Sequence, residues 1–180
     1  MNKPIIQTGY LLKSDCDIIV QQLNCLCVKP HGLSYSIAKK YPYANVYSQR
    51  TQEGSRNLAI DKDRGTPGNI VVSTSVQTPV VIGLYGQYDF GKAVTRNYRP
   101  SYDPPETSKM REKWFKKSLK ILAKWLDGNE LNCGHIKIGF PYGIGCGLAG
   151  GDWSKYLVMI EKFTKDVHCQ VVILKLKNAP

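Results

Sequence analysis

The segment between Phe140 and Trp153 constrains this chain more than any other part of its sequence. It reads Phe-Pro-Tyr-Gly-Ile-Gly-Cys-Gly-Leu-Ala-Gly-Gly-Asp-Trp and lies between an apolar stretch, 136–140, and a helical pattern, 153–163. Glycine adopts positive φ angles and lets the backbone approach a ligand closely. A helix that begins beside such a loop presents unpaired N–H groups and a partial positive charge. Strand, glycine loop and helix together therefore predict a phosphate-binding site.

The run from Gly145 to Gly150 also fits the GxGxxG pattern of dinucleotide-binding proteins. A Rossmann fold needs an acidic residue about 20 residues further on, at the end of the next strand. The next predicted strand is Gln170–Leu176, and the residues after it, Lys177 to Pro180, include no acid. We reject the Rossmann interpretation on this ground. A glycine-rich turn without a ligand is the remaining alternative, although so many glycines cost backbone entropy on folding.

Length and composition predict one globular domain spanning residues 1–180. The chain has 42% hydrophobic and 22% charged residues, which is ordinary for a globular protein. No apolar run approaches the length of a membrane span, and the first residues lack the apolar core of a signal peptide. We expect a soluble, intracellular, monomeric protein in the cytoplasm or nucleus, without a membrane partner.

The cysteines do not predict a metal site. None of the six forms a CxxC pair, and Cys25-Leu-Cys27 has no second pair at zinc spacing. We expect free, mostly buried thiols in a reducing compartment, with no metal and no cofactor.

Positive charge is concentrated between residues 92 and 124. This stretch holds ten of the Lys and Arg residues against three acids, in a chain of net charge +11. Such a patch attracts polyanions, so nucleic acid is a candidate partner for residues 92–124. The alternative is a solvated helix face followed by a basic loop, and no zinc-finger or RNP motif favours nucleic acid.

Strands and helices alternate along the chain, which is typical of a layered α/β fold. Leu33–Tyr41 reads as a helix stopped by Pro42. Ser108 is a candidate N-cap for an amphipathic helix whose apolar residues recur from Met110 to Trp125. The predicted strands are Asp17–Asn24, Ile70–Ser73, Pro79–Tyr85, Gly134–Phe140 and Gln170–Leu176, with the second and third paired antiparallel.

Two loops carry the candidate functional residues, and each follows a predicted strand and precedes a helix. The first contains Asn24, His31 and Gly32, and the second contains the glycines and Asp152. Ligands of open α/β sheets bind beyond the carboxyl ends of such strands, so both loops could converge on one phosphorylated ligand.

Three of these residues have alternative roles. His31 is a candidate general acid or base, because an imidazole titrates near neutral pH, or it is only a loop residue. Asp152 is a good helix N-cap and also a candidate catalytic carboxylate. Cys146 could gain reactivity from the helix N-terminus, but a small side chain directed into the core is the favoured interpretation.

The two loops and their flanks resemble the macro domain, the ADP-ribose-binding fold, over most of the chain. The first matching part comprises Gly9 to Leu12, Asp17 to Asn24 and His31 to Ala38, and the second, more specific part is Pro141 to Trp153. The resemblance is greatest to the branch of glutamate-ADP-ribose hydrolases and DNA-ADP-ribose hydrolase antitoxins. The yeast-type ADP-ribose-1″-phosphate phosphatases are more distant.

This resemblance implies a three-layer α/β/α sandwich with a mixed central sheet and ADP-ribose in a surface cleft. Asn24 stands at the position of the family's Asn that contacts the distal ribose, and Gly32 stands in the glycine stretch near that ribose. The resemblance also implies that backbone N–H groups of the second loop bind the diphosphate. The residues of that loop are Gly143, Ile144, Gly145, Cys146, Gly147 and Leu148.

The sequence departs from the family pattern at three places. Tyr10 replaces the Asp that binds adenine, so Asp15 or Asp17 could take over, or Tyr10 could stack on the base. Gln87 stands where the hydrolases of this branch carry a reactive Lys, and Ala149 replaces an Asp that some members use. Tyr85, in the same stretch as Gln87, completes the candidate ligand contacts.

Three hypotheses follow from these residues. The first is a hydrolase of ADP-ribose derivatives, with the substrate either ADP-ribose-1″-phosphate or ADP-ribose attached to a macromolecule. Asn24, His31 and Asp152 are its candidate catalytic residues. The second is an inactive reader of ADP-ribose or a related nucleotide, and the third is a nucleic-acid-associated module that uses the basic stretch.

Overall fold

The central element of the fold is one six-stranded mixed sheet. A computed structural model describes residues 3–76, 79–94 and 99–177. The strand order is β1-β6-β5-β2-β4-β3, and every neighbouring pair is parallel except the antiparallel pair β3 and β4. The strands are β1 (Ile5–Thr8), β2 (Ile18–Asn24), β3 (Ile70–Ser73), β4 (Val80–Gln87), β5 (Lys137–Pro141) and β6 (Gln170–Lys175).

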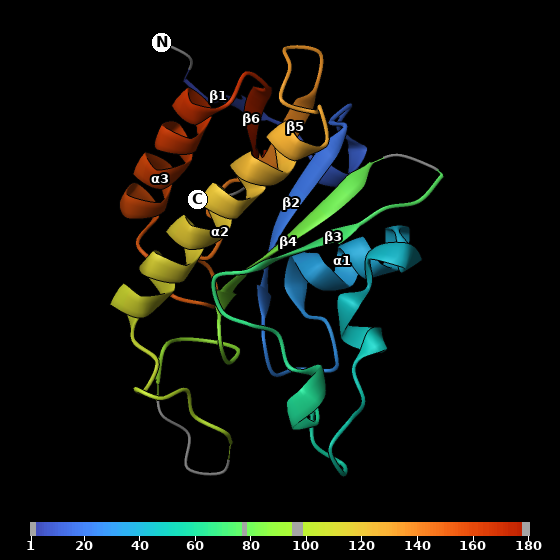
Figure 1. The fold of residues 1–180 in the computed structure, drawn as a ribbon, viewed down its shortest axis with the longest axis vertical. Helices are drawn as coiled ribbons and strands as arrows, with labels where there is room; N and C mark the ends of the chain where they lie inside the picture. The colour runs from blue at the N-terminus through green and yellow to red at the C-terminus, as the bar shows by residue number, and fades with distance from the viewer. Residues whose placement is uncertain (1–2, 77–78, 95–98, 178–180) are drawn as a thin grey trace.

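Helices cover both faces of this sheet (Figure 1). The long helix α2 (Ser108–Gly128) and α3 (Trp153–Asp166) lie on one face, and α1 (Gly32–Lys40) lies on the other. The described residues thus form the expected three-layer α/β/α sandwich. Short 3₁₀ helices supplement these layers: η1 (Leu11–Lys13), η2 (Pro42–Ala44), η3 (Val46–Gln49) and η4 (Asp61–Asp63).

Strand β2 is buried on both faces, which explains its continuous apolar run. Ile18 and Val20 pack in the core beneath α2 and α3, whereas Ile19 packs with Ile37 of α1 on the opposite face. All four side chains are at most 1% exposed. Because successive strand residues point to opposite faces, β2 anchors both helical layers.

Most predicted elements are present, with their ends shifted by a few residues. Ile70–Ser73 is confirmed and pairs antiparallel with β4 as expected. The predicted cap Ser108 is wrong: Thr107 is the N-cap of α2, and its hydroxyl accepts the Met110 N–H at 3.1 Å. Strand β1, a short edge strand whose four residues are all exposed, is not among the predicted strands.

The topology brings the two glycine-bearing loops together. Strands β2 and β5 are parallel neighbours, so the loops after Asn24 and Pro141 leave the same edge of the sheet. The loop after β4 leaves this edge as well, because β4 is also parallel to β2. Among the described residues, no helix is both long and apolar enough to cross a bilayer.

Candidate functional site

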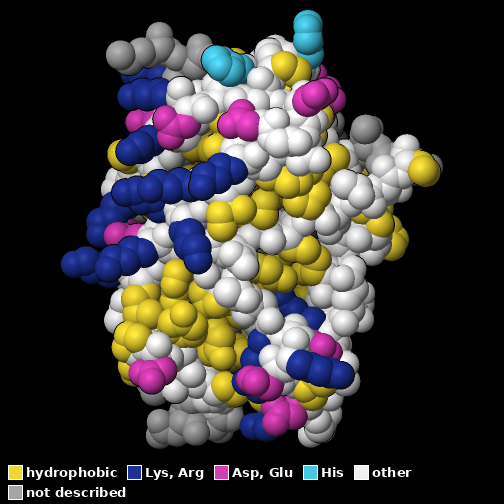
Figure 2. Space-filling model, in the orientation of Figure 1, with side chains coloured by type: hydrophobic (Ala, Val, Ile, Leu, Met, Phe, Trp, Pro, Cys, Tyr) yellow, Lys and Arg dark blue, Asp and Glu magenta, His cyan; other side chains and the backbone are white. Residues whose placement is uncertain are grey.

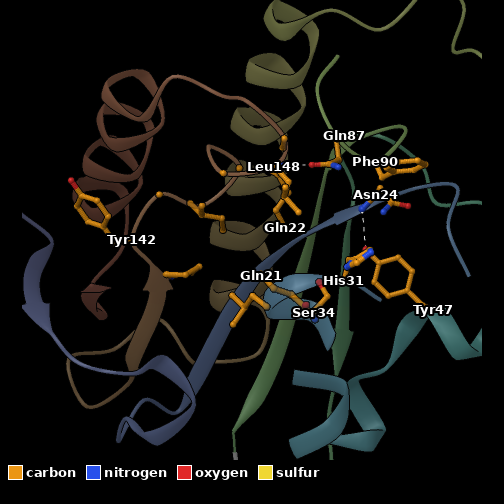
Figure 3. A pocket seen from close by; sticks show the side chains of 18 residues that line it. Gln21, Gln22, Asn24, His31, Ser34, Tyr47, Gln87, Phe90, Tyr142 and Leu148 are labelled. Atoms are coloured by element: carbon orange, nitrogen blue, oxygen red, sulfur yellow. Dashed lines mark hydrogen bonds between the residues drawn. The ribbon is translucent and has the colours of Figure 1, made fainter. Parts of the chain in front are cut away.

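A cavity of about 310 Å³ opens where these three loops meet the start of α1 (Figure 3). Its walls come from the carboxyl end of β2, the loop after β4, the glycine loop after β5 and the first turn of α1. The described lining residues are Gln21, Gln22, Asn24, His31, Leu33, Ser34, Tyr47, Gln87, Phe90, Gly91, Pro141, Tyr142, Gly143, Ile144, Gly145, Gly147, Leu148 and Ala149.

Asn24 ends β2 with its amide held in one orientation. Its Oδ1 accepts the N–H of Cys27 at 2.8 Å, and its own backbone N–H donates to the Tyr47 hydroxyl at 3.2 Å. The side chain is nearly buried, and the Cys27 N–H fixes which way its amide points. The Asn24 amide nitrogen is therefore a fixed hydrogen-bond donor at the cavity wall.

The glycine loop is tightly folded and leaves several N–H groups unpaired. Gly143 and Gly145 have φ angles of 71° and 74°, which favour glycine. The N–H groups of Ile144 and Cys146 are used within the loop, by the carbonyls of Pro141 and Gly143. Within the described part of the chain, no hydrogen bond is made by the N–H groups of Gly143, Gly145, Gly147 or Leu148.

The first turn of α1 forms another wall of the cavity. His31 is the N-cap residue, and its imidazole makes no capping hydrogen bond. Gly32 follows with a φ of 54°, and the neighbouring Leu33 and Ser34 line the cavity. Since this turn begins a nine-residue helix, its N–H groups carry partial positive charge toward the cavity.

Tyr47 lies behind Asn24 and fixes that end of the cavity (Figure 3). The ring is 4% exposed, and burial raises the pKa of the hydroxyl to about 12. The hydroxyl therefore stays protonated at neutral pH, when it can both accept from Asn24 and donate to another group.

A chain of carboxamides crosses the floor of the cavity. Gln87 Nε2 donates to the carbonyl of Asp89 at 3.0 Å, and Gln22 Nε2 donates to Gln87 Oε1 at 2.7 Å. The Asp89 carbonyl accepts only, so it fixes the orientation of both amides. Gln22 Oε1 and the nearly buried Gln21 Oε1 have no hydrogen-bond donor among the described residues. Both acceptors belong to side chains that line the cavity.

Two buried ion pairs shape the loop after β4. Arg99 contacts Asp89 at 2.9 Å, and Arg111 of α2 contacts Glu106 at 2.7 Å. Arg111 also donates to the carbonyls of Gly91 at 2.5 Å and Ala149 at 3.0 Å. It thereby joins the loop after β4 to the glycine loop, and both of these loops line the cavity.

The structure brings seven of the predicted site residues to the cavity. They are Asn24, His31, Gly143, Ile144, Gly145, Gly147 and Leu148. Gly32 lies between two lining residues but does not itself line the cavity. Their convergence follows from the parallel pairing of β2 with β5.

The remaining predicted residues lie elsewhere. Tyr10 follows the edge strand β1. Asp17 precedes β2, at the end of that strand away from the cavity, and its carboxylate accepts the Lys137 N–H at 2.8 Å. The Tyr85 hydroxyl accepts from Arg50 at 3.4 Å, outside the cavity. Asp152 caps α3 by accepting from the N–H of Ser154 at 3.0 Å.

Cys146 packs against the core rather than lining the cavity. Its thiol donates to the carbonyl of Ile144 at 3.3 Å, and burial raises its pKa to about 11. Asp152 adds to this shift, because a nearby carboxylate disfavours the thiolate. The small side chain directed inward, favoured from the sequence, agrees with this arrangement.

Several lining residues were not expected from the sequence. Gln21 and Gln22 belong to a strand motif that drew attention only to Asn24, and Ser34 looked like an ordinary helix residue. Phe90 lies in the loop after β4, a part of the chain in which the sequence pointed to no lining residue beyond Gln87. Nothing in the sequence indicated that Tyr47 lines the cavity, because this depends on the contact between η3 and the end of β2, where its hydroxyl accepts the Asn24 N–H.

The described lining contains no Lys, Arg, Asp or Glu. A bound anion would therefore meet backbone N–H groups and amides rather than a cationic side chain. No cluster of His, Cys, Asp or Glu suited to a metal ion occurs among the described residues.

Comparisons with known proteins find similarity in structure alone. No protein-family model matches the sequence, and no curated protein matches it significantly. The macrodomain of Mycobacterium tuberculosis DarG superposes with a TM-score of 0.62 at 18% identity, over 94% of this chain and 97% of that one. Thermosipho africanus DarTG in complex with ADP-ribose superposes with a TM-score of 0.68 at 12% identity, over 97% of this chain and 42% of that one.

A third similar structure comes from a eukaryote. The Trypanosoma brucei macrodomain in complex with ADP has a TM-score of 0.58 at 14% identity, over 94% of this chain and 61% of that one. The fold of this chain thus agrees with solved structures of macrodomains from different organisms. The chain has the macrodomain fold.

Proposed function

We propose that this protein binds ADP-ribose, free or as part of a larger molecule, in the cavity at the carboxyl edge of its sheet. The observation that carries the proposal is the glycine loop, whose unpaired N–H groups adjoin the cavity. Two similar macrodomain structures contain ADP-ribose and ADP, which supports a ligand of this class.

The diphosphate is assigned to the glycine loop. Gly145, Gly147 and Leu148 offer N–H groups, and the N-terminus of α1 adds a second set of partial positive charges. Charge-assisted hydrogen bonds of this kind are roughly twice as strong as neutral ones. They compensate for the absence of cationic side chains among the described lining residues.

The distal ribose is assigned to the end of the cavity formed by Asn24, His31 and Ser34. Asn24 Nδ2 supplies a fixed donor there, and the unpaired Gln21 Oε1 supplies a buried acceptor. A ribose carries hydroxyl groups that both donate and accept, so it satisfies both residues at once.

The test uses Gly147, because a Cβ there meets no atom within 4 Å and the backbone is not in the left-handed region. A Cβ at Gly145 would instead clash with Gln22 and Tyr156, so substitution there confounds binding with folding. Gly147→Glu places a carboxylate beside the bound diphosphate and should weaken ADP-ribose binding at least about a hundredfold, or about 2.7 kcal/mol.

Gly147→Ala is the matched control and should change the affinity by less than about threefold. Calorimetry with ADP-ribose measures both variants, and circular dichroism confirms their fold. Equal affinities of the two folded variants would refute diphosphate binding at this loop.

Hydrolysis of an ADP-ribose derivative is the second candidate, favoured by the free imidazole of His31. That imidazole lines the cavity and makes no capping bond, so it is available to deprotonate a water molecule held near the distal ribose. No lysine lines the described cavity, and Gln87 occupies its floor, so the proposed route forms no lysyl adduct.

Turnover of ADP-ribose-1″-phosphate and of ADP-ribosylated protein tests this candidate. His31→Ala should lower turnover about a hundredfold while leaving ADP-ribose affinity within a few fold. Borohydride added during turnover should trap nothing, because no amine takes part. A mass gain at Lys92, whose stem lies beside Gly150, would restore a lysine mechanism. A protein that binds ADP-ribose and hydrolyses none of these substrates is a reader.

A further inference from the structure

The surface between α2 and α3 carries the largest concentration of lysines on the described molecule. Figure 2 shows Lys and Arg side chains in rows over the region where these helices lie in Figure 1. Two adjoining hollows of about 500 and 200 Å³ follow the line between the helices, and both include Lys116 and Met159. We call this continuous surface the α2–α3 groove.

The charges of the groove are mostly unpaired. Lys155 forms an ion pair with Glu112 at 3.1 Å, and Asp166 is the only other acid in the two hollows. Six further lysines line the groove, and none forms an ion pair within the described part of the chain: Lys109, Lys113, Lys116, Lys120, Lys124 and Lys162. This excess of positive charge in one groove attracts a polyanion.

The basic stretch expected from the sequence is thereby divided in two. Arg99 and Arg111 are buried in ion pairs with Asp89 and Glu106, so they hold the cavity loops and contribute little to the surface. The α2 lysines remain exposed and gain Lys155 and Lys162 from α3 as neighbours. The binding surface therefore includes a helix outside the stretch 92–124.

We propose that the α2–α3 groove binds the phosphate backbone of double-stranded nucleic acid without reading its sequence. The five α2 lysines that line the groove recur every three or four residues, so they lie on one face of the helix. From Lys109 to Lys124 they extend over about 22 Å, the length of about six or seven base pairs.

The residue types favour a duplex backbone over other polyanions. The groove contains no arginine, the residue that most often reads guanine by two hydrogen bonds, and lysine binds phosphate as a point charge. Its only aromatic residue, Phe163, is 3% exposed, so unpaired bases have no ring on which to stack. Val158 is the only large apolar side chain of the groove that is strongly exposed, which offers little to an amphipathic acidic helix.

The test compares two variants that remove the same charge from different places. The groove variant replaces Lys113, Lys116, Lys120 and Lys124 with Gln. The control variant replaces Lys13, Lys29, Lys39 and Lys62, four exposed lysines outside α2 and α3, with Gln. Fluorescence anisotropy measures binding to a labelled duplex of about 12 base pairs over a range of salt concentrations.

The wild-type affinity should fall steeply with salt, and the groove variant should reduce the slope of log K against log salt by about 3 to 4. The control variant should leave this slope within about one of the wild type. Both variants should retain ADP-ribose affinity, which separates this proposal from the function of the cavity.

Equal losses of duplex affinity in the groove variant and the control variant would show that net charge alone attracts the duplex, and would overturn the proposal. Tighter binding to a single strand of the same length would overturn the assignment to a duplex. Displacement of the duplex by polyglutamate at equal charge concentration would instead assign the groove to an acidic protein segment.

Discussion

At the residue scale, the cavity depends on side chains whose orientation is fixed by backbone partners. Asn24 is held by Cys27, and Gln87 is held by Asp89, which in turn orients Gln22. The place of Asn24 beside the glycine loop could be predicted, because it ends a strand that precedes a loop and a helix. The orientation of its amide could not, because that depends on the turn that brings the Cys27 N–H to Oδ1.

Asn24→Asp separates the binding role of this residue from its structural role. The carboxylate keeps an oxygen for the Cys27 N–H but removes the Nδ2 donor and adds a negative charge near the ligand. We expect a native circular dichroism spectrum and an ADP-ribose affinity about 10 to 100 times lower. Affinity for AMP, which lacks the distal ribose, should change much less. Equal losses for both ligands in calorimetry would place Asn24 away from that ribose.

At the element scale, α2 does more than cover the sheet. The sequence predicts an amphipathic helix here, and the observed core residues Phe115, Leu119 and Leu122 confirm it. The role of Arg111 could not be predicted, because its partners lie in two loops that only the folded chain brings together. The edge strand β1 escaped prediction for a related reason: its stability comes from pairing with β6 rather than from burial.

Arg111→Met should destabilise the protein by about 3–5 kcal/mol, because it leaves the buried carboxylate of Glu106 without its partner. It should also weaken ADP-ribose binding, since the lining residues Gly91 and Ala149 lose the hydrogen bonds that join their two loops. Lys120→Met, an exposed site on the same helix, should change stability by less than about 0.5 kcal/mol. Urea denaturation measures the free energy of unfolding of each variant. Similar values for the two variants would show that the Arg111 ion pair does not stabilise the fold.

The N-cap of α3 gives a prediction for pH. Hydrogen bonds from the hydroxyl and backbone N–H of Ser154 lower the pKa of the Asp152 carboxyl. The unfolded chain therefore binds this proton more tightly, so the stabilisation is present above the ordinary carboxyl range and is lost as pH falls through the lowered pKa. Asp152→Asn keeps a capping oxygen but does not titrate. The wild type should be more stable than this variant at pH 7, and the difference should shrink at about pH 3. A stability difference that stays constant with pH would show that ionisation of the Asp152 carboxylate does not stabilise the fold.

At the scale of the whole molecule, the cavity joins parts of the chain that are far apart in sequence. Its lining comes from residues 21–34, Tyr47, residues 87–91 and residues 141–149, and the parallel pairing of β2 with β5 and β4 holds these parts together. This architecture could be predicted from two strand–loop–helix units, because parallel strands bring their following loops to one edge. The distribution of charge between buried ion pairs and the α2–α3 groove could not be predicted. Ten basic residues in one stretch do not show which of them are exposed.

Ligand binding should consequently stabilise the whole fold. A ligand that binds only the native state adds about 2.7 kcal/mol at a concentration 100 times its Kd. For a chain of this size that corresponds to an increase in Tm of about 5–10 °C. Thermal melting with ADP-ribose should show this shift, and AMP at the same concentration should give a smaller one, because it lacks the second phosphate and the distal ribose. The Gly147→Glu variant should show no shift with either ligand, whereas Gly147→Ala should behave as the wild type. Equal shifts for ADP-ribose in the wild type and in Gly147→Glu would mean that the ligand binds away from the glycine loop.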